Sequence, residues 1–286
     1  MKQPGLLLCT DMDRTVIPNG RQPEHPAARC MFNSFCALPE VALVYVTGRH
    51  RELVRQAINT YGLPEPDFAV TDVGTKIYRI AAGQWLEMTA WEKVIAADWH
   101  GKCREQLQDR LSQITELTLQ EESKQNTFKL SYYVSLDQDI DRILARAETC
   151  LKRLGVHANL IWSIDEQEGV GLLDILPRGA TKLHGIQFLQ QQLGFQPEQV
   201  LFAGDSGNDL AVLGSAVRSV LVANASDDIR SQARELAAQN GHPETLFLAD
   251  QRNGPIGGHY AAGVLQGIWH FAPEFRAQLR QVGFTR

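Results

Sequence analysis

Leu6-Leu7-Leu8-Cys9-Thr10 runs directly into Asp11-Met12-Asp13-Arg14-Thr15, and this junction decides the predicted fold. Two later apolar runs end in the same abrupt way. Ala42–Val46 leads into Thr47-Gly48-Arg49, and Val200–Ala203 leads into Gly204-Asp205-Ser206-Gly207-Asn208-Asp209. Unbroken apolar runs are typical of strands that helices cover on both faces. Because the loops at the carboxyl ends of parallel strands line one crevice, we expect these polar side chains to meet there.

The two aspartates of the first loop suit the cleavage of a phosphate ester. Asp11, at the end of its strand, is placed to attack phosphorus and form an aspartyl-phosphate, which splits one difficult step into two. Asp13, two residues later, is placed to protonate the leaving oxygen and then to activate water. Positioned acid–base groups of this kind contribute roughly 10²–10⁴ in rate.

The remaining polar residues suit phosphate binding. Thr47 offers a hydroxyl to a phosphate oxygen, with Gly48 and Arg49 beside it. Lys182 follows Pro177–Thr181 at the start of a helical pattern, and both its ammonium and the amides of a helix N-terminus favour an anion.

The carboxylates also predict a metal site. Mg²⁺ binds oxygen ligands and needs only one or two carboxylates besides the substrate phosphate. We expect these from Asp11 and Asp205, with the backbone carbonyl of Asp13 as a further ligand. Each motif alone has a structural explanation, as a loop, a turn or a capped helix start. Their conjunction after successive apolar runs favours the functional interpretation.

The composition excludes several protein classes. Hydrophobic residues make up 44% and charged residues 21%, as in ordinary globular proteins. The 28 Lys+Arg against 33 Asp+Glu give a net charge of −5, and no basic run stands out, so we expect no nucleic-acid partner. No stretch approaches membrane-spanning length, so no membrane partner is expected. The five cysteines are scattered, which favours free thiols in a reducing cytoplasm, and we expect a cytoplasmic monomer.

The apolar pattern changes twice along the chain. Residues 1–84 and 177–286 show successive strand–helix units, whereas residues 85–176 combine alternating strands with amphipathic helices. We therefore predict an α/β fold with a Rossmann-like parallel-sheet core and an inserted small α/β cap over residues 85–176. Hinges are expected near Ile80–Gln84 and Pro177–Gly179. Lys129, on the alternating pattern Phe128–Val134, is the cap residue that we expect to bind the substrate.

Four of these signals together resemble the motifs of the haloacid dehalogenase superfamily of phosphohydrolases. The resemblance implies that Asp11 is the nucleophile, that Asp13 is the acid/base and that Mg²⁺ is the cofactor. It adds Asn208 and Asp209 to the expected catalytic residues, with Asn208 also expected at the substrate. The position of the insert resembles a C2-type cap. The matching motifs are Asp11-x-Asp13-x-Thr15, Thr47, Lys182 and Gly204-Asp205-x-x-Asn208-Asp209.

Further stretches look like the sucrose-phosphate phosphatase group of that superfamily: 71–78, 128–133, 173–177 and 261–264. The likeness runs over most of the chain and is weaker in the cap and after Asn240. It implies hydrolysis of a disaccharide phosphate, with sucrose 6-phosphate as the first expectation and a sugar-phosphate synthase as a protein partner to test. Relatives in this branch act on other glycosyl-sugar phosphates, such as mannosylfructose phosphate, so that alternative stays open.

Two other functions are compatible with the same fold. A phosphomutase uses the same Asp11/Asp13 pair but needs a phospho-enzyme that resists water. A non-catalytic domain that binds a synthase can lose motif residues, whereas here the motif residues are all present.

Overall fold

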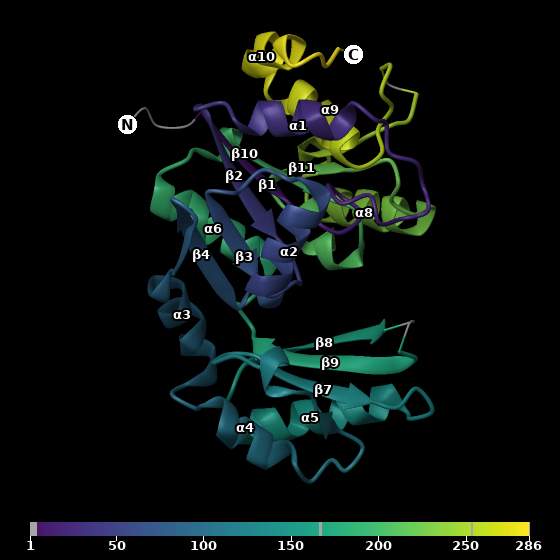
Figure 1. The fold of residues 1–286 in the computed structure, drawn as a ribbon. Coiled ribbons are helices and arrows are strands. Elements are labelled where there is room, and N and C mark those ends of the chain that lie inside the picture. The colour runs from purple at the N-terminus through teal and green to yellow at the C-terminus, as the bar shows by residue number, and fades with distance from the viewer. Residues whose placement is uncertain (1–4, 166–167, 253, 286) are drawn as a thin grey trace. The chain divides into compact units, whose positions relative to one another are not determined.

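The computed structural model describes residues 5–165, 168–252 and 254–285 (Figure 1). The chain forms two compact units. Unit 1 comprises Met1–Glu87 and Lys182–Arg286, and unit 2 comprises Met88–Thr181.

Unit 1 is built on a sheet with the strand order β12-β11-β10-β1-β2-β3-β4-β5 within the described residues. Neighbours from β12 to β3 pair in parallel, and the last two pairs are antiparallel. Every residue of β1, β2 and β10 is buried, as expected for strands covered on both faces. The strands are β1 (Leu6–Thr10), β2 (Val41–Val46), β3 (Phe68–Thr71), β4 (Lys76–Ala81), β5 (Gln84–Glu87), β10 (Val200–Gly204), β11 (Arg218–Leu221) and β12 (Leu246–Leu248).

Helices cover both faces of this sheet (Figure 1). One face forms a core with α1, α2, α9 and α10, to which alternate strand residues such as Leu6, Leu8 and Leu43 contribute. The helices α6, α7 and α8 pack against the sheet from outside this core. The helices are α1 (Ala28–Cys36), α2 (Arg51–Tyr61), α6 (Lys182–Leu193), α7 (Leu210–Leu213), α8 (Asp227–Gln239), α9 (Ala261–Phe271) and α10 (Arg276–Gln281).

Unit 2 is a smaller antiparallel sheet, ordered β6-β7-β9-β8 in the described part of the chain, with helices against it. Its core joins α4 and α5 to the sheet, with Trp99, Leu107 and Ile143 meeting Leu130 and Leu173. The elements are α3 (Thr89–Ala96), α4 (Arg104–Leu111), β6 (Thr118–Leu119), β7 (Leu130–Val134), α5 (Ile140–Leu154), β8 (Ala158–Asp165) and β9 (Val170–Pro177).

The α/β class with a parallel core sheet is confirmed, but several details differ from the sequence predictions. The unit boundaries fall at 87/88 and 181/182, where 84/85 and 176/177 were predicted. At the first boundary β5 pairs with β4 in the core sheet, and at the second β9 runs to Pro177 in the sheet of unit 2. The residues Ile80–Gln84 form the end of the β4–β5 hairpin, and the hinge expected near them stays a prediction. Lys129 was placed on the strand pattern Phe128–Val134, but it precedes β7 and is buried.

The helix α9 is buried over most of its length, since Ala261 through Ile268 are all buried. Within the described residues, none of the helices combines the length and apolar character that crossing a bilayer requires.

Candidate active site

Loops that follow three adjacent strands of unit 1 form the site. In the sheet, β1 lies between β10 and β2, so Asp11, Thr47 and Asp205 all leave the same edge. Backbone hydrogen bonds continue past the strand ends: Asp11 N donates to Ala203 O at 2.8 Å, and Thr47 N donates to Val70 O at 2.9 Å. The structure therefore brings the three predicted loops together.

Lys182, the first residue of α6, lies at the centre of the polar contacts. Its Nζ lies 3.0 Å from Asp11 Oδ2 and donates to Asp209 Oδ1 at 2.7 Å and to Asn208 Oδ1 at 3.0 Å. Burial disfavours the ammonium, but the two carboxylates outweigh it and raise the pKa of Lys182 above its ordinary value. The side chain therefore stays charged and can offset the charge of a bound phosphate.

Asp209 positions its neighbours. Its Oδ2 accepts from the backbone N–H of Asp205 at 3.0 Å and of Ser206 at 3.1 Å, while its Oδ1 faces Lys182. The carboxylate folds back against Gly204, where a Cβ would lie 2.5 Å from the Asp209 carboxyl carbon. Glycine at position 204 is thus required by this close approach. With both oxygens occupied, Asp209 acts by fixing the loop that carries Asp205.

Asp11 and Asp205 have the oxygens that fit a divalent cation. Among the described residues, ligand oxygens of Asp11, Asp205 and Asp209 lie within 4.8 Å of one another. Asp205 Oδ2 is buried without a hydrogen-bond donor, and its nearest cation is Arg14 Nε at 3.3 Å. A buried carboxylate oxygen without a donor is costly unless it meets a positive charge. The donor set suits a hard cation that takes oxygen ligands.

Burial and crowding of like charge perturb both of these carboxyls. Burial, assisted by the Asp209 carboxylate, raises the pKa of Asp205 to about 6 against the opposing charges of Arg14 and Lys182. Burial also raises the pKa of Asp11, although Lys182 opposes it. A cation between these carboxylates would relieve the same repulsion.

Asp13 is held apart from that cluster. Arg49 donates to it in bidentate fashion, from Nε at 2.7 Å and from a terminal nitrogen at 2.6 Å, and Asn19 Nδ2 donates at 2.8 Å. Burial would raise the pKa of Asp13, but the hydrogen bonds and charge of Arg49 outweigh it and lower the pKa. The structure pairs its side chain with Arg49, and the role of its backbone carbonyl as a metal ligand stays a prediction.

The remaining predicted residues divide between the two units. Thr47 is buried, and its hydroxyl accepts from Arg49 N at 3.2 Å. Lys129 belongs to unit 2, where its ammonium lies 3.6 Å from Asp174 Oδ1 and Ser131 donates to the same carboxylate. Its expected role in binding the sugar stays a prediction.

Sequence reasoning missed Arg14 and the residues that hold it. Arg14 belongs to the loop that carries Asp11 and Asp13, and its side chain reaches Asp205 at 3.3 Å. Its backbone is in a left-handed conformation, with φ 55°. Asn224 Nδ2 donates to Arg14 O at 2.6 Å, while Asn224 Oδ1 accepts from Tyr260 N at 2.8 Å. No short-range signal identifies these contacts, because Asn224 and Tyr260 are far from Arg14 in sequence.

The model of the sucrose-6F-phosphate phosphohydrolase family matches residues 4–272. The chain belongs to this family. The family has the haloacid dehalogenase fold, and the protein is a phosphoric monoester hydrolase.

Three of the proteins similar to this chain are a bacterial hydrolase, a plant enzyme and a cyanobacterial enzyme of known structure. A "putative HAD-like hydrolase" of Nitrosococcus oceani is 46% identical, covering 97% of this chain and 74% of that protein. Sucrose-phosphatase 1 of Nicotiana tabacum is 30% identical, covering 93% of this chain and 59% of that protein, so the chain spans about three-fifths of the plant enzyme. The Synechocystis sucrose-phosphatase, solved with sucrose and phosphate, is 26% identical with a TM-score of 0.71, covering 94% of this chain and 98% of that chain.

Proposed function

We propose that this family member is a Mg²⁺-dependent phosphatase that converts sucrose 6-phosphate and water to sucrose and phosphate. The observation that carries the proposal is the buried Asp11 carboxylate at the end of β1, held by Lys182, in a chain that matches the family over residues 4–272. The relatives named as sucrose-phosphatases support sucrose 6-phosphate as the substrate.

Asp11 and Asp13 divide the chemistry between them. An Asp11 carboxylate oxygen attacks phosphorus, forming a P–O bond as the bond from phosphorus to the sugar oxygen breaks. Asp13, as the carboxylic acid, delivers its proton to that sugar oxygen. In the second step Asp13 takes a proton from water, the water oxygen attacks phosphorus, and the aspartyl–phosphate bond breaks to restore Asp11.

Other residues of the site bind the phosphate and neutralise its charge. The Lys182 ammonium lies 3.0 Å from Asp11, where it can pair with a phosphate oxygen that approaches the nucleophile. Mg²⁺, held by Asp11 and Asp205, would supply positive charge to the transferring phosphoryl group. Asn208, within 3.0 Å of Lys182, and Thr47 are placed to orient the same oxygens.

Arg49 imposes a condition on the first step. As it stands, its bidentate pair holds Asp13 as the carboxylate, which suits the water-activating step. Protonation of the leaving oxygen requires Asp13 to carry a proton, so Arg49 must loosen its hold, as it can when a phosphate competes for its guanidinium.

The proposal is tested by hydrolysis of a substrate panel with Mg²⁺. Sucrose 6-phosphate should be preferred over mannosylfructose phosphate, hexose 6-phosphates and p-nitrophenyl phosphate. Asp11→Asn should abolish turnover and phospho-enzyme formation while keeping the far-ultraviolet circular dichroism of the wild type. A preference for mannosylfructose phosphate would replace the substrate, and phosphate transfer between hexose positions would replace the reaction with a mutase. Association with a synthase, a monomeric state and a cytoplasmic location stay predictions.

A further inference from the structure

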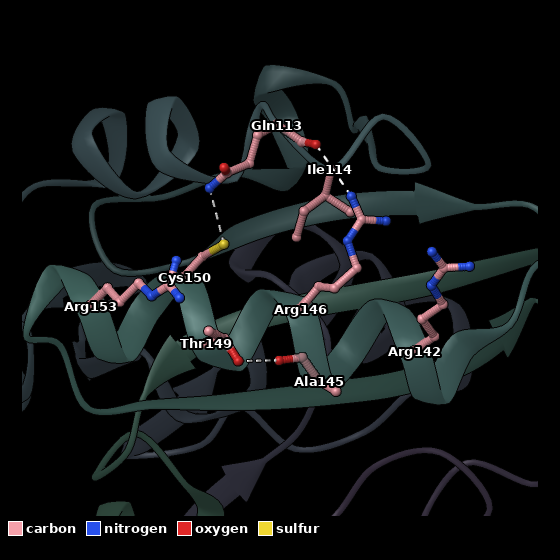
Figure 2. A pocket seen from close by; sticks show the side chains of 8 residues that line it. All are labelled: Gln113, Ile114, Arg142, Ala145, Arg146, Thr149, Cys150 and Arg153. Carbon is pink, nitrogen blue, oxygen red and sulfur yellow. Dashed lines mark hydrogen bonds between the residues drawn. The ribbon is translucent and has the colours of Figure 1, made fainter.

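A cationic pocket lies on the outer side of helix α5 in unit 2 (Figure 2). Its cavity measures ≈ 390 Å³. Three of its lining residues are arginines, and none is acidic, although the whole chain carries a net charge of −5. The lining residues are Gln113, Ile114, Arg142, Ala145, Arg146, Thr149, Cys150 and Arg153.

Helical spacing gathers the charges on one stripe. Arg142, Arg146 and Arg153 stand at positions i, i+4 and i+11 of α5, which at 3.6 residues per turn lie on one side of the helix. Like charges at i and i+4 destabilise a helix slightly. Glu116 pairs with Arg146, so the uncompensated positive charge of this stripe lies at Arg142 and Arg153 within the described residues.

Arg146 is already fixed in place. It donates to Glu116 from one terminal nitrogen and to the backbone oxygen of Gln113 from the other, at 3.3 Å. In Figure 2 its guanidinium lies beside Ile114. Because these contacts have already ordered the side chain, binding through its remaining N–H groups loses little conformational entropy.

Arg142 and Arg153 are the two arginines of the pocket whose charges are not paired within the described residues. Within the described residues neither has an acidic partner within ion-pair distance, and both are exposed. Arg153 also borders a neighbouring hollow lined by Glu105 and Asp109, with which it forms no such pair in the described structure. Each guanidinium thus retains the planar fork that binds phosphate in bidentate fashion.

We propose that this pocket binds a small organic phosphate with a phosphate chain, of the nucleoside diphosphate class. Arg142 and Arg153 are 11 residues apart in one helix, or about 16 Å along its axis, so a ligand with more than one phosphate is better suited than inorganic phosphate to contact both. Ala145, which is exposed and lines the pocket, offers an apolar surface for an attached ring. This site belongs wholly to unit 2 and uses none of the residues assigned to phosphate hydrolysis.

The test measures ADP binding by calorimetry in the presence of EDTA. The double variant Arg142→Gln/Arg153→Gln should bind ADP at least tenfold more weakly than the wild type. Lys93→Gln/Lys152→Gln is the matched control, since it removes two exposed positive charges from unit 2 outside the pocket. It should bind ADP as the wild type does, and both double variants should keep the wild-type melting temperature and phosphatase activity.

Hydrogen–deuterium exchange locates the bound nucleotide. ADP should slow exchange in Ile140–Leu154 of the wild type and not of the pocket variant. Inorganic phosphate should produce no such protection at equal concentration. Equal ADP affinity in the wild type and the pocket variant, protection confined to the Asp11 and Thr47 loops, or no binding at millimolar ADP would each overturn the proposal. A hexaglutamate peptide that binds this pocket more tightly than ADP would also overturn it, in favour of an acidic protein segment.

Discussion

Asp209→Asn tests whether one buried carboxylate holds the active site together. Asp209 is fully buried, with Oδ1 facing Lys182 and Oδ2 facing two backbone N–H groups. An asparagine amide has one acceptor oxygen and a donor nitrogen, so it can satisfy one side and presents N–H groups to donors on the other. Removing one partner of a buried ion pair costs about 3–5 kcal/mol. We expect about 3 kcal/mol, the lower end, because Asp11 stays 3.0 Å from the ammonium.

Urea unfolding followed by circular dichroism measures this loss, with the transitions of the two units fitted separately. Glu235→Gln is the matched control: it removes an exposed carboxylate from α8 and should change the free energy of unfolding by less than about 0.5 kcal/mol. The double variant Asp209→Asn/Lys182→Met should be less destabilised than the sum of its single variants by at least about 1 kcal/mol. Additive single effects, or an Asp209→Asn loss no larger than that of Glu235→Gln, would refute the reasoning.

Arg49→Ala should raise the pKa of Asp13 and so move the basic limb of the kcat/KM profile to higher pH. The control Arg51→Ala removes a pair with exposed Glu52 and should leave that limb in place. An unmoved limb in Arg49→Ala would contradict the pairing of Arg49 with Asp13. The Asp205 pKa of about 6, raised from 3.8, means that its neutral form favours the fold at low pH and that ionisation through about pH 6 costs up to about 3 kcal/mol. The melting temperature of the metal-free protein should therefore fall as pH rises through 6. Mg²⁺ should raise the melting temperature more at about pH 7.5 than at about pH 5. An equal effect of Mg²⁺ at both pH values would argue against a cation at Asp205. Lys129→Ala should raise KM for the disaccharide phosphate and scarcely change hydrolysis of p-nitrophenyl phosphate, and equal loss on both would assign Lys129 to the fold of unit 2.

Elements with a strong local pattern could be predicted from the sequence. The helix α5 has its apolar residues at regular helical spacing, with Asp139 as its N-cap and Gly155 in a left-handed conformation at its end. The strand β1 is apolar throughout and ends at Asp11. The β4–β5 hairpin was missed, because its residues gain their structure from pairing at the sheet edge and carry little pattern of their own.

The candidate site shows the same division. The identities of Asp11, Thr47 and Asp205 follow from residue type and position after strands, and that of Lys182 from its place at a helix start. The structure brings these residues together. The pairing of Asp13 with Arg49 could not be predicted, because it depends on side-chain conformations in loops that share no local pattern.

The position of β1 in the sheet has a consequence for synthesis of the chain. Leu7 pairs with Val200, a residue 193 positions later, and all of unit 2 is made between them. At about 5–20 residues per second, one edge of β1 waits about 10–40 s on the ribosome for its partner. During that time an apolar strand exposes unpaired N–H and C=O groups to any neighbouring nascent chain. A chaperone that covers the first strand until β10 emerges should therefore increase the yield of folded protein more than one that acts on the completed chain.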